Sequence, residues 1–277
     1  MIQNYLTVDV EDYYQVSAFE PIVGASNWSH YPSRVSKNTR IILETLARHN
    51  VKATFFVVGW TGKHHPHLVK EILENGHNIG CHSYYHRLIY NLTSQEFKEE
   101  THRAKDVLEQ ITGKSVLGYR APSYSITKQS LWAYDILEEL GFSYSSSIFP
   151  IHHDRYGIPD APRFRHKVPG HDIMEYPIST ARYLGRNIPV SGGGYFRLLP
   201  YYFTRMALSR INNTECQPFV FFIHPWELDP EQPRMKGASP LSRFRHYTNL
   251  GKTKKRFQKL LNAFQFGSIP EDSTDPG

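Results

Sequence analysis

The chain has 277 residues, of which 40% are hydrophobic and 21% are charged. This length and composition suit one large globular domain with a substantial core, and they exclude a mainly disordered chain. The longest apolar runs, residues 53–60 and 218–223, fall far short of the roughly 20 residues that a membrane-spanning helix needs. We therefore expect no transmembrane segment.

The N-terminus does not have the pattern of a secretory signal. Residues 1–10 lack a basic region followed by an apolar stretch, and they already include Asp9. The two cysteines, Cys81 and Cys216, are too few for a disulfide framework and predict reduced thiols. We therefore expect a cytoplasmic protein.

Short β-rich runs alternate with longer helical patterns along the chain. Seven strands are predicted, at residues 5–9, 53–58, 78–81, 116–120, 142–147, 173–177 and 219–223. Helices are predicted at residues 37–49, 68–74, 94–111 and 130–140, and Thr93 and Glu96 are placed to form a capping box. This alternation predicts an α/β fold, a distorted seven-stranded (β/α) barrel with its helices outside.

The barrel is expected to span residues 1–230, followed by a C-terminal extension, 231–277, packed on it. The formal net charge of +6 gathers late in the chain: nine basic residues and no acidic one lie between Gln232 and Pro270. This block could face a polyanion or form a solvated helix face. Residues 148–169 show no periodicity and predict a long loop over the barrel mouth, where such loops often determine specificity.

Three carboxylates, Asp9, Glu11 and Asp12, cluster at the end of the first predicted strand. Such packing is costly unless a cation or a shared proton relieves the repulsion, so it indicates a functional acidic site. The alternative is a solvated turn in which Asp12 only caps a helix. Strand alternation puts residue 11 on the face of residue 9, whereas a strand that ended at Asp9 could deliver Asp12 instead.

Two histidines, His82 and His86, follow the third predicted strand at a spacing of four residues. If the segment turns helically, both imidazoles can meet one ion, and a carboxylate from another strand would complete a two-histidine, one-carboxylate site with open positions. The sequence therefore predicts a metal site here, with Glu11 or Asp12 as the third ligand.

Two further groups follow strands. Arg120 could pair with a catalytic carboxylate and keep it ionised, while Pro122 stiffens the turn that presents a backbone N–H near Tyr124. His224 ends the last apolar strand and suits a general acid that protonates a leaving amine. All these groups lie at carboxyl ends of strands, the face where barrel enzymes build their active sites.

In this order along the chain, these residues resemble the polysaccharide deacetylases of the NodB-homology, carbohydrate-esterase type. The carboxylates resemble the first motif of that family, residues 82–86 its metal-binding motif, residues 120–124 its arginine-proline-tyrosine motif, and His224 its late histidine. Three more segments are similar to a subgroup in bacterial exopolysaccharide gene clusters that are linked to exosortase (PEP-CTERM) protein sorting: residues 192–197, 224–227 and 244–249.

The sequence departs from the family at two places. The family motif has adjacent aspartates, base then metal ligand, whereas here Val10 and Glu11 separate Asp9 from Asp12. The family also carries an aspartate that orients the late histidine, and the corresponding stretch here, residues 144–147, holds none. Asp154 and Asp160 in the following loop are the candidates for that support.

The resemblance implies metal-assisted hydrolysis of an N-acetyl group on an amino sugar. A divalent ion, with zinc expected, would be held by His82, His86 and Glu11 or Asp12. Asp9 would be the base, Arg120 its partner, the N–H of Tyr124 an oxyanion donor and His224 the acid. The partner would be an N-acetylated glycan, free or lipid-linked. The protein itself could be a monomer or an oligomer. Sugar-stacking aromatics are expected beside the motifs, at Tyr13, Tyr14, Tyr85 and Trp226.

Three other functions compete with this one. The same superfamily fold supports hydrolases of small cyclic amides or imides, and a non-catalytic glycan-binding protein could keep the barrel. The basic block could also bind nucleic acid, but no nucleic-acid motif accompanies it, so we expect none.

Overall fold

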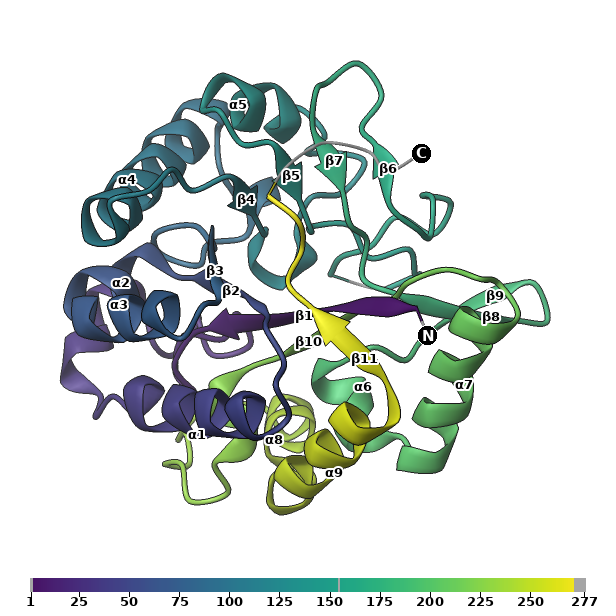
Figure 1. Cartoon of the computed structure of the whole chain (residues 1–277). Coiled ribbons are helices and arrows are strands. Elements are labelled where there is room, and N and C mark those ends of the chain that lie inside the picture. Colours follow the sequence, from purple (N-terminus) through teal and green to yellow (C-terminus); the bar gives the residue numbers. More distant parts are fainter. Residues whose placement is uncertain (1, 154, 272–277) are drawn as a thin grey trace.

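The computed structural model describes residues 2–153 and 155–271, and it shows a curled, mostly parallel sheet surrounded by helices (Figure 1). The sheet order is β10–β1–β2–β3–β4–β5–β7–β6, and β11 also pairs with β1. Its strands are β1 (Gln3–Val10), β2 (Thr54–Val57), β3 (Asn78–Cys81), β4 (Gly118–Tyr119), β5 (Tyr144–Ser145), β6 (His166–Lys167), β7 (Met174–Glu175), β10 (Val220–Ile223) and β11 (Gln265–Gly267). Among these pairs only β6–β7 is antiparallel.

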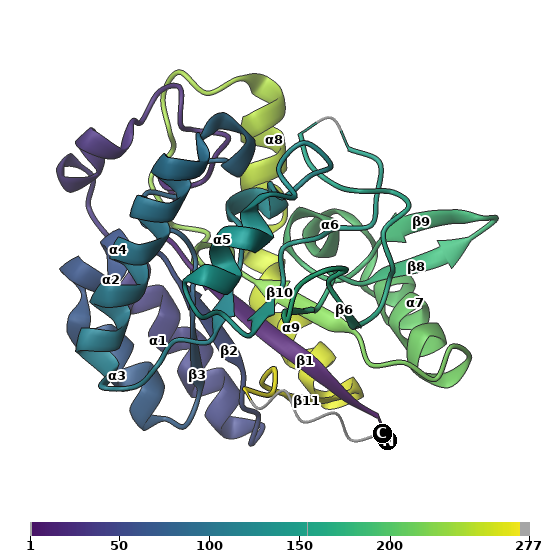
Figure 2. The same ribbon diagram turned by 90° about the horizontal axis from the view of Figure 1, so that it is seen from above.

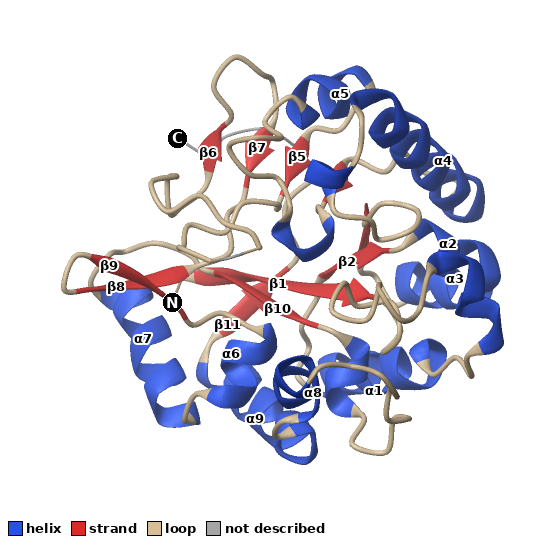
Figure 3. Ribbon diagram, turned by 180° about the vertical axis from the view of Figure 1, so that it is seen from behind, coloured by secondary structure: helices blue, strands red, loops and turns tan. Residues whose placement is uncertain are grey.

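The helices lie around the outside of the sheet (Figure 3). The α-helices are α1 (Val35–Arg48), α2 (Gly59–His64), α3 (Pro66–Glu74), α4 (Ser94–Thr112), α5 (Ala133–Glu139), α6 (Gly193–Leu198), α7 (Tyr201–Asn213), α8 (Pro240–Tyr247) and α9 (Leu250–Ala263). Short 3₁₀ helices are η1 (Ala25–His30), η2 (Ile89–Asn91), η3 (Pro122–Tyr124) and η4 (Pro225–Leu228). No helix of the described ranges combines the length and apolar character needed to cross a bilayer.

The chain between β7 and β10 bridges the two ends of the curled sheet. A separate hairpin, β8 (Thr180–Tyr183) and β9 (Arg186–Pro189), projects from the body (Figure 2). Just after it, Gly192 forms a parallel bridge with Phe222 of β10, and the hydroxyl of Ser191 donates to the carbonyl of Ser179. These contacts attach this part of the chain to β10. The predicted distorted barrel is confirmed as a curled α/β sheet.

Along β1, side chains point alternately toward the helices and toward the interior of the curled sheet. Leu6, Val8 and Val10 pack in the large core cluster beneath the helices, because successive side chains of a strand point to opposite faces. Thr7 and Asp9 point the other way and both accept hydrogen bonds from Arg120. The sheet interior therefore holds a buried polar network directly beneath the carboxyl ends of the strands.

Each of the seven predicted strands has a counterpart in the structure, and residues 78–81 match β3 at both ends. The capping box of α4 is confirmed, since Thr93 and Glu96 each accept a hydrogen bond from the other's backbone N–H. Prediction missed β6, β8, β9 and β11, and also α2 and α6–α9. Two glycines in the six-residue α2 explain one omission, because glycine lowers helix propensity.

The basic C-terminal segment contributes to the sheet as well as to the outer helices. β11 pairs with the first half of β1, and the α9 side chains Phe257, Leu260 and Leu261 are buried in the core. The division at residue 230 stays a prediction. Cys81 is buried and Cys216 is exposed, and both are free thiols.

Candidate metal centre and active site

Glu11, His82 and His86 form the centre of the site. One ligand atom from each lies within 4.8 Å of the other two, and all three side chains are buried. Glu11 follows β1, and His82 follows β3, two strands away in the sheet order. The parallel arrangement brings these two strand ends to one edge, as the sequence predicted.

The two histidines approach Glu11 through a tight loop rather than the expected helical turn. Ser83 and His86 adopt left-handed backbone conformations with φ of 59° and 54°, which are uncommon outside glycine. Glu100 of α4 stabilises the loop by accepting hydrogen bonds from the Ser83 hydroxyl and the Tyr85 N–H, both at 2.7 Å. Sequence reasoning did not identify Glu100 as a support of this loop.

Asp12 does not join the histidines. Its carboxylate accepts hydrogen bonds from the Ser33 hydroxyl and from the backbone N–H groups of Arg34 and Val35, where α1 begins. Burial raises the pKa of Asp12, and these donors oppose that shift. Of the two alternatives for the third ligand, the structure therefore favours Glu11, and Asp12 takes the capping role.

The donor set of this centre fits a divalent cation. His82 donates its Nδ1–H to the carbonyl of Arg120 at 2.7 Å, which fixes the tautomer and leaves Nε2 as a lone-pair donor. Burial lowers the pKa of His82 to about 4, so this imidazole is neutral at ordinary pH. Burial would raise the pKa of Glu11, but His86, His224 and His82 outweigh it and hold that pKa well below its usual range. Two imidazoles and one carboxylate suit zinc and related ions.

Asp9 is held beside this centre by Arg120. The guanidinium Nη1 donates to Asp9 Oδ1 at 2.7 Å and to the hydroxyl of Thr7, while Nη2 donates to the hydroxyl of Ser146. Both partners of the ion pair are almost fully buried. Removing one partner of such a pair leaves an uncompensated buried charge, which typically costs about 3–5 kcal/mol. Ser146, from the stretch without the expected aspartate, thus supports the arginine.

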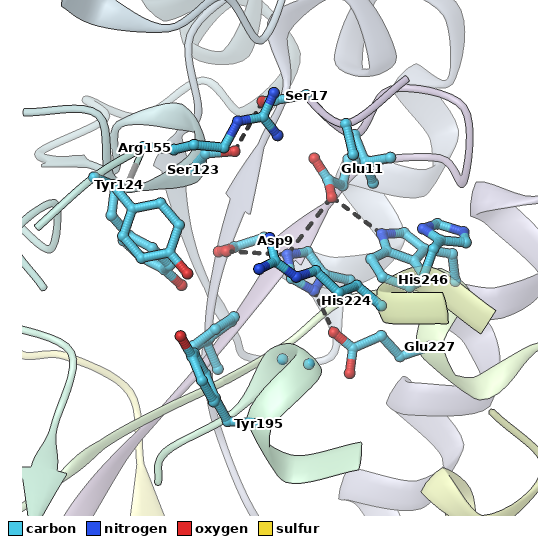
Figure 4. A pocket seen from close by; sticks show the side chains of 18 of the residues that line it. Asp9, Glu11, Ser17, Ser123, Tyr124, Arg155, Tyr195, His224, Glu227 and His246 are labelled. Atoms are coloured by element: carbon cyan, nitrogen blue, oxygen red, sulfur yellow. Dashed lines mark hydrogen bonds and ion pairs between the residues drawn. The ribbon is translucent and has the colours of Figure 1, made fainter. Parts of the chain in front are cut away.

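His224 lies opposite Asp9, with its Nε2 at 3.7 Å from Asp9 Oδ2 and 3.5 Å from Glu11 Oε1 (Figure 4). Its Nδ1–H donates to Glu227 Oε1 at 2.5 Å. Burial would lower the pKa of His224, but Glu11, Glu227 and Asp9 outweigh it and raise that pKa to about 9. His224 is therefore an imidazolium at neutral pH.

The support of His224 corrects the expectation for Asp160. Glu227 of η4 orients the imidazole, whereas Asp160 pairs with Lys128 on the surface, and Asp154 lies outside the described residues. Glu227 in turn faces buried Arg197, with 3.4 Å between its Oε2 and Arg197 Nε. The spacing His-Pro-Trp-Glu was visible in the sequence, but the contact between Glu227 and Arg197 depends on the tertiary structure.

The expected sugar-stacking residues divide into two groups. Trp226 lines the pocket, and its indole N–H donates to Glu11 Oε1 at 3.0 Å, so it also positions a ligand of the metal centre. Tyr13 and Tyr14 are fully buried and pack on each other, and Tyr85 packs beneath Arg103. None of these three tyrosines lines this pocket, and their substrate-binding role stays a prediction.

Tyr124 lines the pocket and points toward its interior (Figure 4). Its backbone N–H, the predicted oxyanion donor, donates to the carbonyl of Ala121 at 3.0 Å. Its phenol hydroxyl has no hydrogen-bond partner among the described residues, and burial raises its pKa well above the usual range. Tyr124 thus offers a protonated hydroxyl to whatever fills the pocket.

These groups share one pocket of about 430 Å³. Phe149 and Tyr156, from the predicted long loop, lie in its wall, as do Tyr195 of α6 and His246 of α8. The loop at residues 148–169 therefore contributes to the mouth as predicted. A metal-type centre, an acid–base pair and aromatic walls converge here, as expected of a hydrolase acting on a polar ligand.

Family comparisons agree with this architecture. Residues 26–145 match the family model described as polysaccharide deacetylase, and residues 146–272 match one described as a domain of unknown function (DUF3473). Residues 26–145 are therefore similar to the polysaccharide deacetylases, and the predicted resemblance is confirmed. His82, His86, Arg120 and Tyr124 lie within the deacetylase match, whereas Asp9 and Glu11 precede it.

Curated relatives are similar over part of the chain. Peptidoglycan-N-acetylglucosamine deacetylase PgdA of Listeria monocytogenes is 37% identical over 100 residues, 36% of this chain and 20% of that protein. Peptidoglycan-N-acetylmuramic acid deacetylase PdaA of Bacillus subtilis is 35% identical over 81 residues, 29% of this chain and 31% of that protein. The chain thus spans a fifth to a third of the length of these relatives.

Solved structures share the fold across nearly the whole chain. A Mycobacterium smegmatis protein assigned to the polysaccharide deacetylases aligns with a TM-score of 0.55 at 18% identity, covering 100% of this chain and 96% of that chain. A family 4 carbohydrate esterase from Streptomyces lividans aligns with a TM-score of 0.51 at 14% identity, covering 98% and 94%. A family 4 pseudoenzyme from Bacillus anthracis also aligns, with a TM-score of 0.51 at 16% identity, covering 96% and 63%. The fold alone does not establish activity.

Proposed function

We propose that this protein is a metal-dependent hydrolase that removes N-acetyl groups from amino-sugar residues of a glycan. The observation that carries the proposal is the single pocket in which Glu11, His82 and His86 lie between Asp9 and His224. The peptidoglycan deacetylases among the relatives support the N-acetylated glycan as substrate.

Glu11, His82 and His86 would hold the cation, for which zinc is the first candidate. When bound, such an ion lowers the pKa of a water molecule and polarises the amide carbonyl. The chain supplies the proton transfers. Asp9, fixed by Arg120, takes a proton from the attacking water as the new C–O bond forms.

His224 then serves the leaving group. As an imidazolium, it gives its Nε2 proton to the sugar nitrogen while the C–N bond breaks, which yields acetate and a free amine. The hydroxyl of Tyr124 would donate to the developing oxyanion, and this donor replaces the occupied backbone N–H of the same residue.

The exopolysaccharide assignment rests on the three segments that resemble the exosortase-linked subgroup. In the structure the three segments meet at Arg197, which faces Glu227 and donates to the carbonyls of His246 and Thr248. A lipid-linked form of the substrate and a cytoplasmic location belong to the same proposal, and binding of vesicles and cell fractionation would test them.

Acetate release from N-acetylated amino-sugar oligomers tests the activity. The purified protein is stripped with a chelator, assayed, reloaded with Zn²⁺ and assayed again. We expect release only after reloading. An Asp9→Asn variant should keep the metal and lose most turnover, while His82→Ala should lose the metal as well.

Either of two outcomes would contradict the proposal and favour another function. Release of product from small cyclic amides or imides, but not from any sugar oligomer, would indicate the related amidohydrolase activity. Tight glycan binding without any acetate release, in protein whose metal content is confirmed, would indicate a glycan-binding homologue.

A further inference from the structure

Three side chains form a polar corner of the pocket, which consists of Ser17, Ser123 and Arg155. The hydroxyl oxygens of Ser17 and Ser123 lie 2.8 Å apart. Figure 4 shows the guanidinium of Arg155 beside this pair of hydroxyls. The proposed hydrolysis does not use any of these three groups.

The backbone at the polar corner is strained. Ser123 and the following Tyr124 both have left-handed conformations, with φ of 49° and 54°. Such conformations are unfavourable for residues other than glycine, and they cluster at sites that bind ligands. The strain places the Ser123 hydroxyl against Ser17 and at the pocket wall.

The charges that line the pocket are unequally compensated. Its carboxylates are Asp9, Glu11 and Glu227, and each already contacts a cationic or imidazole partner. Buried Arg197 faces Glu227. Two exposed arginines of the lining are Arg155 and Arg245 of α8. Among the lining residues that the structure describes, no carboxylate is ion-paired with either of them.

We propose that the polar corner binds the carboxylate of an acidic sugar that neighbours the N-acetylated sugar in the glycan. An arginine guanidinium offers two parallel N–H donors that match a carboxylate, and hydroxyls complete its hydrogen bonds. Arg245 adds a second positive charge at the mouth. The inference rests on the proposed function and narrows its substrate to glycans that contain uronic acid.

Binding is measured on the Asp9→Asn variant, so that the ligand is not consumed. The probes are a hyaluronan hexasaccharide, which alternates N-acetylglucosamine with glucuronic acid, the same oligomer after reduction of its carboxyl groups, and a neutral chitin hexamer. We expect the uronate-bearing oligomer to bind roughly tenfold more tightly than its reduced form.

Charge-removing variants locate the effect. Arg155→Gln should abolish this tenfold preference and Arg245→Gln should reduce it. Lys255→Gln, which removes an exposed charge of α9 outside the pocket lining, should leave it unchanged. Equal loss in all three variants would show long-range electrostatics and overturn the polar corner as the binding site.

The remaining outcomes separate this inference from the proposed function. Equal affinity for native and carboxyl-reduced oligomers would overturn the acidic-sugar inference, even if the unsubstituted protein with Zn²⁺ releases acetate from chitin. Uronate preference without acetate release from any glycan would support the subsite and contradict the function. Competition by UDP-N-acetylglucosamine that depends on Arg155, without uronate preference, would show that the anion is a phosphate.

Discussion

His224 is surrounded by carboxylates, and its protonation is the most testable property at the residue scale. Its pKa is raised to about 9 from the usual 6.5 because Glu11, Glu227 and Asp9 outweigh the effect of burial. A raised folded-state pKa contributes stability that is fully present below pH 6.5 and is lost as the pH rises through 9.

Nitrogen NMR of the His224 ring in the metal-free protein checks this property. We expect the imidazolium signal to persist at neutral pH and to titrate near pH 9. Titration at or below pH 6.5 would contradict the acid role, because His224 would then be neutral where the reaction must deliver a proton.

Glu227→Gln tests the partner of His224. Glutamine keeps the size and the acceptor but removes the charge, so the imidazole becomes less basic and less firmly oriented. We expect kcat to fall roughly 10- to 100-fold, as for outer-shell partners in other sites, with the metal content unchanged and the His224 titration moved to lower pH.

Exposed Glu231 provides the control for that variant. Glu231→Gln removes the same charge four residues away and should leave both kcat and the titration unchanged. If Glu227→Gln also leaves the titration unchanged, the negative charge of Glu227 does not set the protonation of His224.

At the scale of elements, the narrow interior of the sheet restricts side-chain size. A Cβ at Gly118 of β4 would lie 2.2 Å from the ring of Tyr144 on neighbouring β5. Glycine at this position is therefore required by packing, and the sequence showed no pattern that distinguished it from a glycine of a turn.

Gly118→Ala should destabilise the protein by roughly 1–3 kcal/mol, the usual cost of overpacking a core. Gly251→Ala is the matched control, because its Cβ meets nothing within 4 Å and lies in α9. There alanine should stabilise by up to about 1 kcal/mol through its higher helix propensity. Urea unfolding measures the change in the free energy of unfolding of both variants. Equal changes would show that the Tyr144 ring moves away from the new Cβ without loss of stability.

For the whole molecule, β1 joins the two segments matched by different family models. It pairs with β2 from the deacetylase match and with β10 and β11 from the segment of unknown function. His224 and Glu227 also come from the second segment, so the candidate site and the sheet both include parts of it.

A chain truncated after residue 230 tests whether the C-terminal extension is dispensable. The truncation removes β11 and the buried face of α9, and we expect a loss of cooperative thermal unfolding. The full chain is the control. A truncated protein that unfolds cooperatively at the same temperature would show that residues 231–277 form an accessory extension, as the sequence suggested.

Local patterns were sufficient for much of the fold. Apolar runs predicted the strands that make up most of the sheet, and the side chains of Thr93 and Glu96 specify the start of α4. Two of the missed strands are very short: β11 has three residues, and β6 has two. Strands of two or three residues are too short to show an alternating pattern in the sequence. They form because they pair with a neighbouring strand.

The sequence by itself predicted which residues gather at the candidate site, since Asp9, His82, His86, Arg120 and His224 each lie at or after the end of a predicted strand. Strand ends of a parallel sheet meet at one edge. Only the tertiary structure decided between Glu11 and Asp12, replaced the expected aspartate with Glu227 and buried Tyr13 and Tyr14. The physical reason is that the contacts concerned join residues that are far apart along the chain. Asp12 accepts a hydrogen bond at the start of α1, and Glu227 lies opposite Arg197, 30 residues earlier, so no local pattern predicts either environment.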